Sequence, residues 1–138
     1  MKYTPQALAQ FNESSLYRTL GIRIEFCEDG NARSVLTPTP QVCWPTPGQP
    51  HGGILFTVLD TTMAFAAISS ADEECGCATV DCNIQYPAPA REGPFTCHVT
   101  TMRKTGRTVF VRAELLDTKQ VPVALGQATF RILAPRKA

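Results

Sequence analysis

The sequence predicts an α+β domain in which an antiparallel sheet curves around one long buried helix. Residues 51–71 (HGGILFTVLDTTMAFAAISSA) are apolar at helical spacing and contain no charged residue except Asp60 after the first position. Two strand-like runs precede this stretch and four follow it. A helix that is apolar on nearly every side must be covered, and a single curved sheet built from these strands would cover it.

The composition is that of a compact protein with one core. The chain has 138 residues, of which 43% are hydrophobic and 18% charged, so we expect a single domain over residues 1–138. The formal net charge of +1 gives no reason to expect nucleic acid or a membrane as a partner. Residues 1–15 lack the apolar stretch of an export signal, and we therefore expect a cytoplasmic protein.

A helical segment and a hairpin are expected before the central helix. Residues 1–20 form the N-terminal helical segment of this prediction, in which Pro5 suits a first turn. The runs 22–26 and 32–38 alternate between apolar and polar residues on either side of a turn at 30–31. This pattern predicts an antiparallel hairpin.

A proline-rich loop leads up to the central helix. Residues 38–50 contain five of the eleven prolines of the chain, and prolines remove backbone donors and stiffen the backbone. We expect Trp44 to anchor this loop. Loops held against a rigid element are common places for ligand contacts.

Four strands are expected after the helix. The first run, 78–88, alternates and places Thr79 on one face together with Asp81, Asn83 and Gln85. Its other face carries Val80, Cys82, Ile84 and Tyr86. The further runs are 94–104, 105–117 and 122–133, and residues 135–138 are expected to form a loose tail.

The six cysteines are expected to be reduced and mostly buried, because no export signal precedes them. Cys75 and Cys77 are the only close pair. Their spacing is not that of a zinc knuckle or a thioredoxin-type motif, and no histidine cluster accompanies them. We therefore expect neither a metal ion nor a redox cofactor.

The residues around the start of the helix resemble a known family. His51-Gly52-Gly53, with Asp60 seven residues after the second glycine, is similar to the signature of hotdog-fold acyl-CoA thioesterases. The run 78–93 resembles the phenylacetate-degradation (PaaI-like) branch, which reads T-x-D-x-N-x-x-Y and then P-A-x-x-G. The basic hairpin 103–107 and the last strand also fit this branch.

This resemblance implies a hotdog fold and the hydrolysis of an acyl-CoA to the free acid and CoA. It implies dimers whose sheets join edge to edge, often paired into tetramers, with an active site between two chains. The partners would be an acyl-CoA and further copies of the chain, as a homodimer or homotetramer. Coenzyme A would be part of the substrate, so no separate cofactor is implied, and the sequence leaves open an acyl carrier protein in its place.

Four residues are candidates for the chemistry. A positioned carboxylate such as Asp60 serves as general base or nucleophile toward a thioester. The resemblance assigns the polarisation of the thioester carbonyl to the Gly53 amide, because the first amides of a helix lack internal partners. His51 either contacts the carbonyl or shapes the loop, and Thr79 lies where related enzymes position the attacking water.

Further residues are candidates for binding the substrate. Gly52 allows close approach to the backbone. Family members often carry Asn or Gln where this chain has Pro45 and Thr46, so either Thr46 or Gln49 takes that role or the role is vacant. Phe56, Met63 and Phe65 are expected to line an acyl pocket. Basic residues expected to contact the phosphates of coenzyme A are Arg91, Arg103, Lys104 and Arg107.

Two other functions remain open from the sequence. A non-catalytic acyl-CoA-binding or regulatory module would keep the pocket and the basic hairpin without turnover. An acyl-thioester dehydratase or hydratase would use His51 as its base and would release no thiol. Asp60 argues against the binding module, and hotdog dehydratases usually place their histidine outside an HGG-x6-D arrangement.

Overall fold

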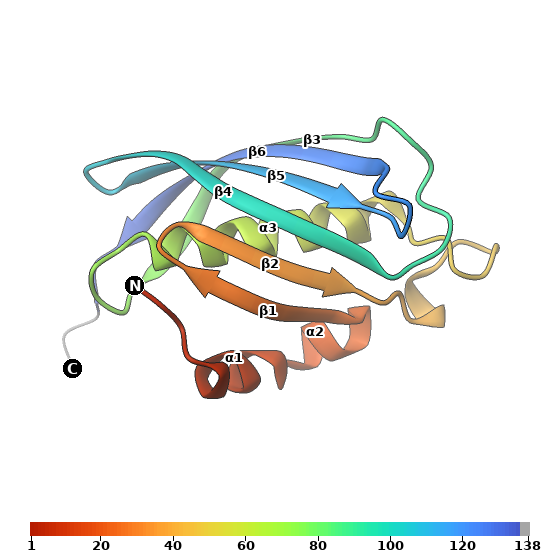
Figure 1. Cartoon of the computed structure of the whole chain (residues 1–138), viewed down its shortest axis with the longest axis horizontal. Helices are drawn as coiled ribbons and strands as arrows, with labels where there is room; N and C mark the ends of the chain where they lie inside the picture. The colour runs from red at the N-terminus through yellow and green to blue at the C-terminus, as the bar shows by residue number, and fades with distance from the viewer. Residues whose placement is uncertain (136–138) are drawn as a thin grey trace.

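The computed structural model describes residues 1–135, and its six-stranded antiparallel sheet folds around one long helix (Figure 1). The elements are α1 (Pro5–Asn12), α2 (Ser15–Leu20), β1 (Ile22–Glu28), β2 (Asn31–Leu36), the 3-10 helix η1 (Pro40–Val42), α3 (Gly52–Ser69), β3 (Gly76–Gln85), β4 (Phe95–Thr105), β5 (Thr108–Leu116) and β6 (Pro122–Leu133). The strand order is β1-β2-β4-β5-β6-β3. This is the hotdog arrangement that the sequence predicts. The tail expected at 135–138 lies outside the described residues from position 136 onward.

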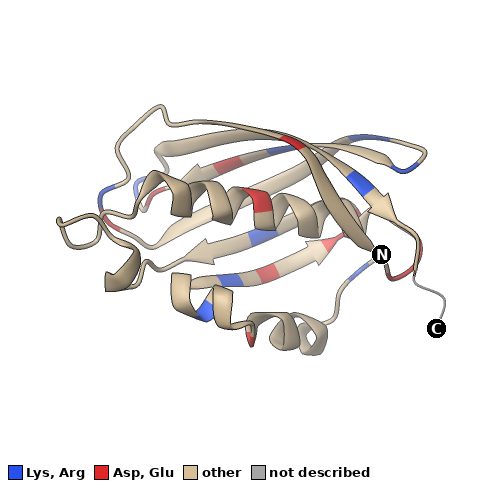
Figure 2. Cartoon of the chain, turned by 180° about the vertical axis from the view of Figure 1, so that it is seen from behind, with Lys and Arg blue, Asp and Glu red and all other residues tan. Residues whose placement is uncertain are grey.

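The helix α3 forms the centre of the core. It is long and apolar enough to cross a membrane by composition alone, but here the sheet covers one of its sides. Gly126 of β6 permits this close packing, because a Cβ at that position would lie 2.9 Å from Leu59 Cδ2. Asp60 is the single charged residue of α3 and is the red segment of that helix in Figure 2.

The N-terminal segment, expected to be helical over residues 1–20, contains two short helices, α1 and α2. Asn12 ends α1, and its side chain pairs with the edge strand β1. The Asn12 amide accepts from Ile24 N–H at 2.8 Å and donates to Ile24 C=O at 2.9 Å. Asparagine is a weak helix former, and the two bonds from Asn12 to β1 hold the chain where α1 ends.

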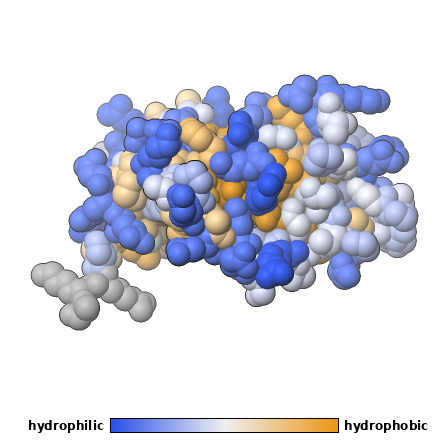
Figure 3. Space-filling view, turned by 60° about the horizontal axis from the view of Figure 1, so that its bottom comes forward, coloured by the Kyte–Doolittle hydropathy of each residue, from blue (hydrophilic) through white to orange (hydrophobic). Residues whose placement is uncertain are grey.

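The two edges of the sheet differ in how they are protected. At the β1 edge, Asn12 occupies backbone groups and α1 packs alongside. At the β3 edge, no other element among residues 1–135 pairs with the outer side of the strand. Figure 3 also shows apolar surface in the middle of the face that carries α1 and α2. The open edge of β3 is a ready site for pairing with a strand of another chain.

The alternation predicted for β3 is wrong at one place, because a β-bulge interrupts the strand. The register with β6 shifts between Thr79 and Asp81, which leaves Val80 as the extra residue. Val80 is 66% exposed, and the bulge puts Thr79 on the same inner face as Cys82. Thr79 therefore does not share a face with Asp81, and this change brings its hydroxyl to α3.

Candidate active site

The inner face of β3, together with Cys75 just before the strand, follows α3 turn by turn. The Cys75 thiol donates to Ile68 C=O at 3.9 Å, and the Cys77 thiol donates to Ala64 C=O at 3.7 Å. One turn nearer the start of the helix, the Thr79 hydroxyl donates to Asp60 Oδ1 at 2.9 Å. The strand thus lies alongside the side of α3 that carries the carboxylate.

Asp60 and Thr79 form the centre of the candidate site. Asp60 is half-buried and Thr79 is exposed, so the pair is open to a ligand. The two nearest thiols are not alternative nucleophiles. Burial, the Cys75 charge and the Asp60 charge raise the pKa of Cys77 to about 11. Burial and the negative charges of Asp60 and Asp81 raise the pKa of Cys82 to about 11, so both thiols stay protonated near neutral pH.

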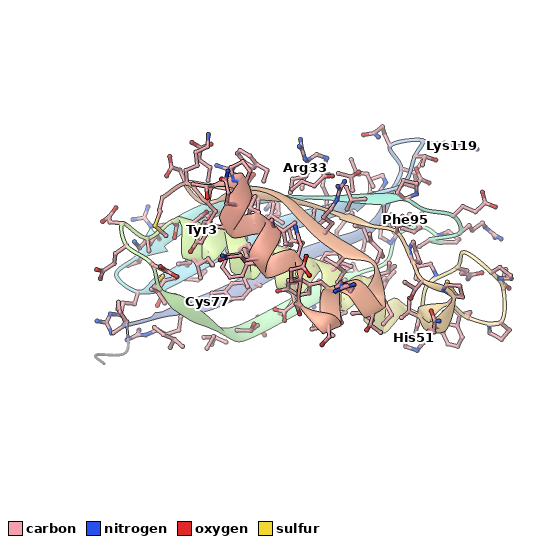
Figure 4. All side chains as sticks on the ribbon, turned by 90° about the horizontal axis from the view of Figure 1, so that it is seen from below. Tyr3, Arg33, His51, Cys77, Phe95 and Lys119 are labelled. Atoms are coloured by element: carbon pink, nitrogen blue, oxygen red, sulfur yellow. The ribbon has the colours of Figure 1, made fainter. Side chains whose placement is uncertain are left out.

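His51 caps the first turn of α3. Its Nδ1 accepts a hydrogen bond from the Gly53 amide at 2.8 Å. A Cβ at position 53 would lie 3.0 Å from that nitrogen, so glycine leaves room for the imidazole. The amide that the sequence assigns to the thioester carbonyl is therefore already bonded in the free chain. Figure 4 shows His51 at this end of the molecule, next to the proline-rich loop.

Tyr86 fixes the same turn from the other side, a role that the sequence did not reveal. Its hydroxyl donates to Gly52 C=O at 2.9 Å. Beside this contact lies an open hollow of about 370 Å³, which Gln49 and Gly52 help to line. The sequence signal for this role was the tyrosine that ends the T-x-D-x-N-x-x-Y run. The alternating pattern alone places this tyrosine on a strand face and gives it no separate role.

The proline-rich loop is held in place by a short backbone ladder. The His51 amide donates to Val42 C=O at 3.0 Å, and the Trp44 amide donates to Gln49 C=O at 2.8 Å. Thr46 lies at the tip, where its carbonyl accepts from the Gln49 amide at 3.3 Å. Arg91 lies beside the tip, since a Cβ on Gly48 would be 3.4 Å from Arg91 O. Four predicted binding residues therefore gather at this end of α3: Thr46, Gln49, Gly52 and Arg91.

Gly53 and Asp60 of one chain do not meet. Seven residues separate them along the helix, which corresponds to about 10 Å along its axis. A carbonyl held at the Gly53 amide is thus too far from the Asp60 carboxylate of the same chain for a direct attack. The two groups fit one reaction centre only if they come from different copies.

The predicted basic hairpin lies at the opposite end of α3. The Lys104 ammonium donates to Ser70 C=O at 3.1 Å, where the helix ends. Lys104 and Arg107 line a hollow of about 440 Å³ together with Asp72 and Glu73. This hollow is about 25 Å along the helix axis from Gly53 of the same chain. Arg103 belongs to the same hairpin, and the structure does not bring these residues to the chain's own Gly53.

The residues predicted to line an acyl pocket are also separated. Phe56 is 38% exposed and lies one turn before Asp60, on the side of the helix that could meet a substrate. Met63 is fully buried in the single chain and lines no surface hollow there. The side chain points into the core, since its Cε would lie 3.3 Å from a Cβ placed on Gly126 of β6. Phe65 is 5% exposed, in edge-to-face contact with Phe11 and Tyr17 of the N-terminal helices.

A larger hollow, about 620 Å³, lies on the outer face of the sheet. It contains His98 and Arg112 but none of the residues predicted from the sequence as catalytic or substrate-binding. All six cysteines are free. Within residues 1–135, no three His, Cys, Asp or Glu side chains gather in a way that would hold a metal ion.

Comparisons with known proteins agree with this fold. The family model described as "Thioesterase superfamily" matches residues 48–124. A Halobacterium salinarum protein, provisionally named an esterase, is 30% identical over 132 residues, which cover 88% of this chain and 86% of that protein.

Two solved structures are similar over most of the chain. A Ralstonia eutropha protein, provisionally described as a thioesterase related to phenylacetic acid degradation, is 25% identical with a TM-score of 0.75 and covers 86% of this chain and 89% of its own. The E. coli PaaI protein from the phenylacetic acid degradation operon shares the fold, with a TM-score of 0.79 at 24% identity over 91% of this chain and 89% of its own. The chain therefore belongs to the thioesterase superfamily and has its hotdog fold.

Proposed function

We propose that this protein hydrolyses an acyl-CoA to the free acid and CoA. The observation that carries the proposal is the half-buried Asp60 carboxylate, which Thr79 binds at 2.9 Å beside the open edge of the sheet. Membership of the thioesterase superfamily supports thioester hydrolysis as the reaction class. The acyl-CoA substrate and the roles of individual residues are the proposal itself.

In this mechanism Asp60 acts as general base. It takes a proton from a water molecule, whose oxygen attacks the thioester carbonyl carbon. The negative charge that develops on the carbonyl oxygen is stabilised at the start of α3. When the intermediate collapses, the carbon–sulfur bond breaks and the CoA sulfur receives the proton from Asp60. Direct attack by the carboxylate, followed by hydrolysis of the anhydride, would give the same products.

The carbonyl is held by a second copy of the chain. Asp60 and Gly53 of one chain are about 10 Å apart along α3, which is too far for one thioester to contact both. The open β3 edge offers a surface on which two copies pair, as a homodimer that forms either the whole assembly or half of a homotetramer. Each site then combines Asp60 of one copy with Gly53 of the other.

The Gly53 amide hydrogen is shared in the complex. In the free chain it is donated to His51 Nδ1 at 2.8 Å. Three-centre hydrogen bonds are common at helix ends, so the carbonyl oxygen shares this hydrogen with the imidazole. Arg91, beside the proline-rich loop, and the hairpin residues Arg103, Lys104 and Arg107 are the proposed contacts to the phosphates of coenzyme A.

The test is thiol release from short-chain, long-chain and aryl acyl-CoAs, with the acid product identified by mass spectrometry. The wild type is expected to release acid and CoA in equal amounts. The Asp60→Ala variant is expected to be about 10²–10⁴-fold slower, because a general base usually contributes a factor of this size. Asp81→Ala is the matched control, because this carboxylate lies on the outer face of β3, away from Asp60.

Three results would contradict the proposal. Full hydrolysis by Asp60→Ala would remove the role of the carboxylate. Binding of acyl-CoAs by the wild type without thiol release would favour the non-catalytic binding module. The observation that favours this module is that the Gly53 amide already donates its hydrogen to His51 Nδ1. Hydration or dehydration of an acyl-CoA without thiol release would favour the dehydratase alternative.

A further inference from the structure

The only tryptophan of the chain lies against the histidine that caps α3. The ring centroids of Trp44 and His51 are 4.6 Å apart, and the ring planes are inclined by 31°. Trp44 is 49% exposed, although a tryptophan side chain gains much from burial. Its main ring-to-ring contact is thus with His51 and not with the hydrophobic core.

The backbone of the loop brings these two rings together. Cys43 and Pro50 form an isolated antiparallel bridge, and the backbone bond between Trp44 and Gln49 extends it. Trp44 and His51 are therefore diagonal neighbours across this short ladder, a position from which large aromatic side chains reach each other. The ladder thus places the two rings within reach of each other.

The stacked imidazole has a defined hydrogen-bonding state. Because His51 Nδ1 accepts from the Gly53 amide, the neutral ring carries its own hydrogen on Nε2. The amide of Gly53 holds the edge of the ring, and the Trp44 indole covers its face. Together they fix the imidazole in one rotamer and one tautomer.

We propose that Trp44 is a positioning residue, which acts through His51 on the Gly53 amide. Without the indole, the imidazole would rotate away from Gly53 and the first turn of α3 would lose its cap. The neighbouring Pro45 has no side-chain hydrogen-bond donor that could hold the ring instead. The kinetic consequence rests on the proposed function, whereas the effect on the state of His51 does not.

The direct test is ¹⁵N NMR of the two histidine side chains in three forms of the protein. Wild type and Trp44→Phe, which keeps a ring for stacking, are expected to show His51 as the Nε2–H tautomer with a hydrogen-bonded Nδ1. Trp44→Leu is expected to show the averaged signals of a mobile imidazole. His98, on the outer face of the sheet, is the internal reference and should not change. Phe110→Leu is the matched control, because Phe110 is another half-exposed aromatic, 43% exposed on β5.

The kinetic test uses the same variants. Trp44→Leu is expected to lower kcat about three- to tenfold, which matches the free energy of an aromatic pair, and Trp44→Phe should restore most of it. An unchanged His51 spectrum in Trp44→Leu overturns the proposal, as does a change in KM alone, which would make Trp44 a substrate contact. If the wild type releases no thiol, the hydrolysis proposal fails and the NMR comparison still decides the role of Trp44.

Discussion

Replacing Thr79 by valine tests how the carboxylate of the candidate site is positioned. The substitution exchanges one hydroxyl for a methyl group of similar shape and removes the 2.9 Å hydrogen bond to Asp60. Hydrogen bonds to ionised groups contribute about 1.5–3 kcal/mol, and the exposure of Thr79 places this one at the low end. A loss of about 1.5 kcal/mol in the transition state lowers kcat slightly more than tenfold.

The assay is steady-state thiol release with the best acyl-CoA of the substrate panel. Thr79→Val should lower kcat and leave KM nearly unchanged, because the hydroxyl orients the base and not the substrate. Thr79→Ser keeps the donor and should keep the rate. Thr100→Val is the matched control, since Thr100 is exposed on the outer face of β4. Wild-type kcat in Thr79→Val, or an equal loss in Thr100→Val, would refute the reasoning.

Three further predictions concern stability and can be measured by denaturant titration. Burial raises the thiol pKa from 9.0 to about 11 in Cys27 and to about 12 in Cys97. Because these folded-state pKa values exceed the unfolded value, the two buried thiols contribute fully to the free energy of unfolding below pH 9. This contribution is lost as the pH rises toward 11, by about 1.4 kcal/mol per pH unit and thiol. Equal stability at pH 8 and pH 10.5 would contradict this prediction. Asn12→Ala leaves two backbone groups of the β1 edge without their partners, so the free energy of unfolding should fall by about 1–2 kcal/mol. An unchanged value would mean that water replaces the amide without cost. Gly126→Ala places a Cβ within 2.9 Å of two side chains and should destabilise by about 1–3 kcal/mol, whereas Gly76→Ala, whose Cβ meets its nearest neighbour at 3.9 Å, should not.

The sequence was sufficient to predict the fold because its strongest signals are local. The apolar run with a lone Asp60, the proline-rich loop and the alternating runs correspond to α3, the loop and the strands of the structure. The face of Thr79 was not predictable in the same way. A β-bulge at Val80 depends on the pairing of β3 with β6, and strict alternation has no signal for such an extra residue.

The sequence named candidate site residues but could not give their arrangement. The motif identified His51, Gly53 and Asp60, but it did not show that the Gly53 amide bonds to its own histidine. Met63 has the flexible, apolar side chain that suits a ligand pocket, and those same properties suit the core in which it lies. Contacts between Trp44 and His51 arise from a backbone ladder in the loop, which composition alone does not specify.

The most direct test of the proposed mechanism is to combine two damaged copies of the chain. Asp60→Asn lacks the base. Gly53→Pro lacks the amide hydrogen and the room for the His51 imidazole, while proline is tolerated in the first turn of a helix. Each variant alone should be nearly inactive, with a circular dichroism spectrum like that of the wild type. In a refolded equal mixture about half of the dimers contain one copy of each variant, and one of the two sites in each such dimer is intact. Recovery of about a quarter of the wild-type rate is the result that a site shared between copies predicts. A mixture no more active than the separate variants would contradict it, because Asp60 and Gly53 would then have to act within one chain.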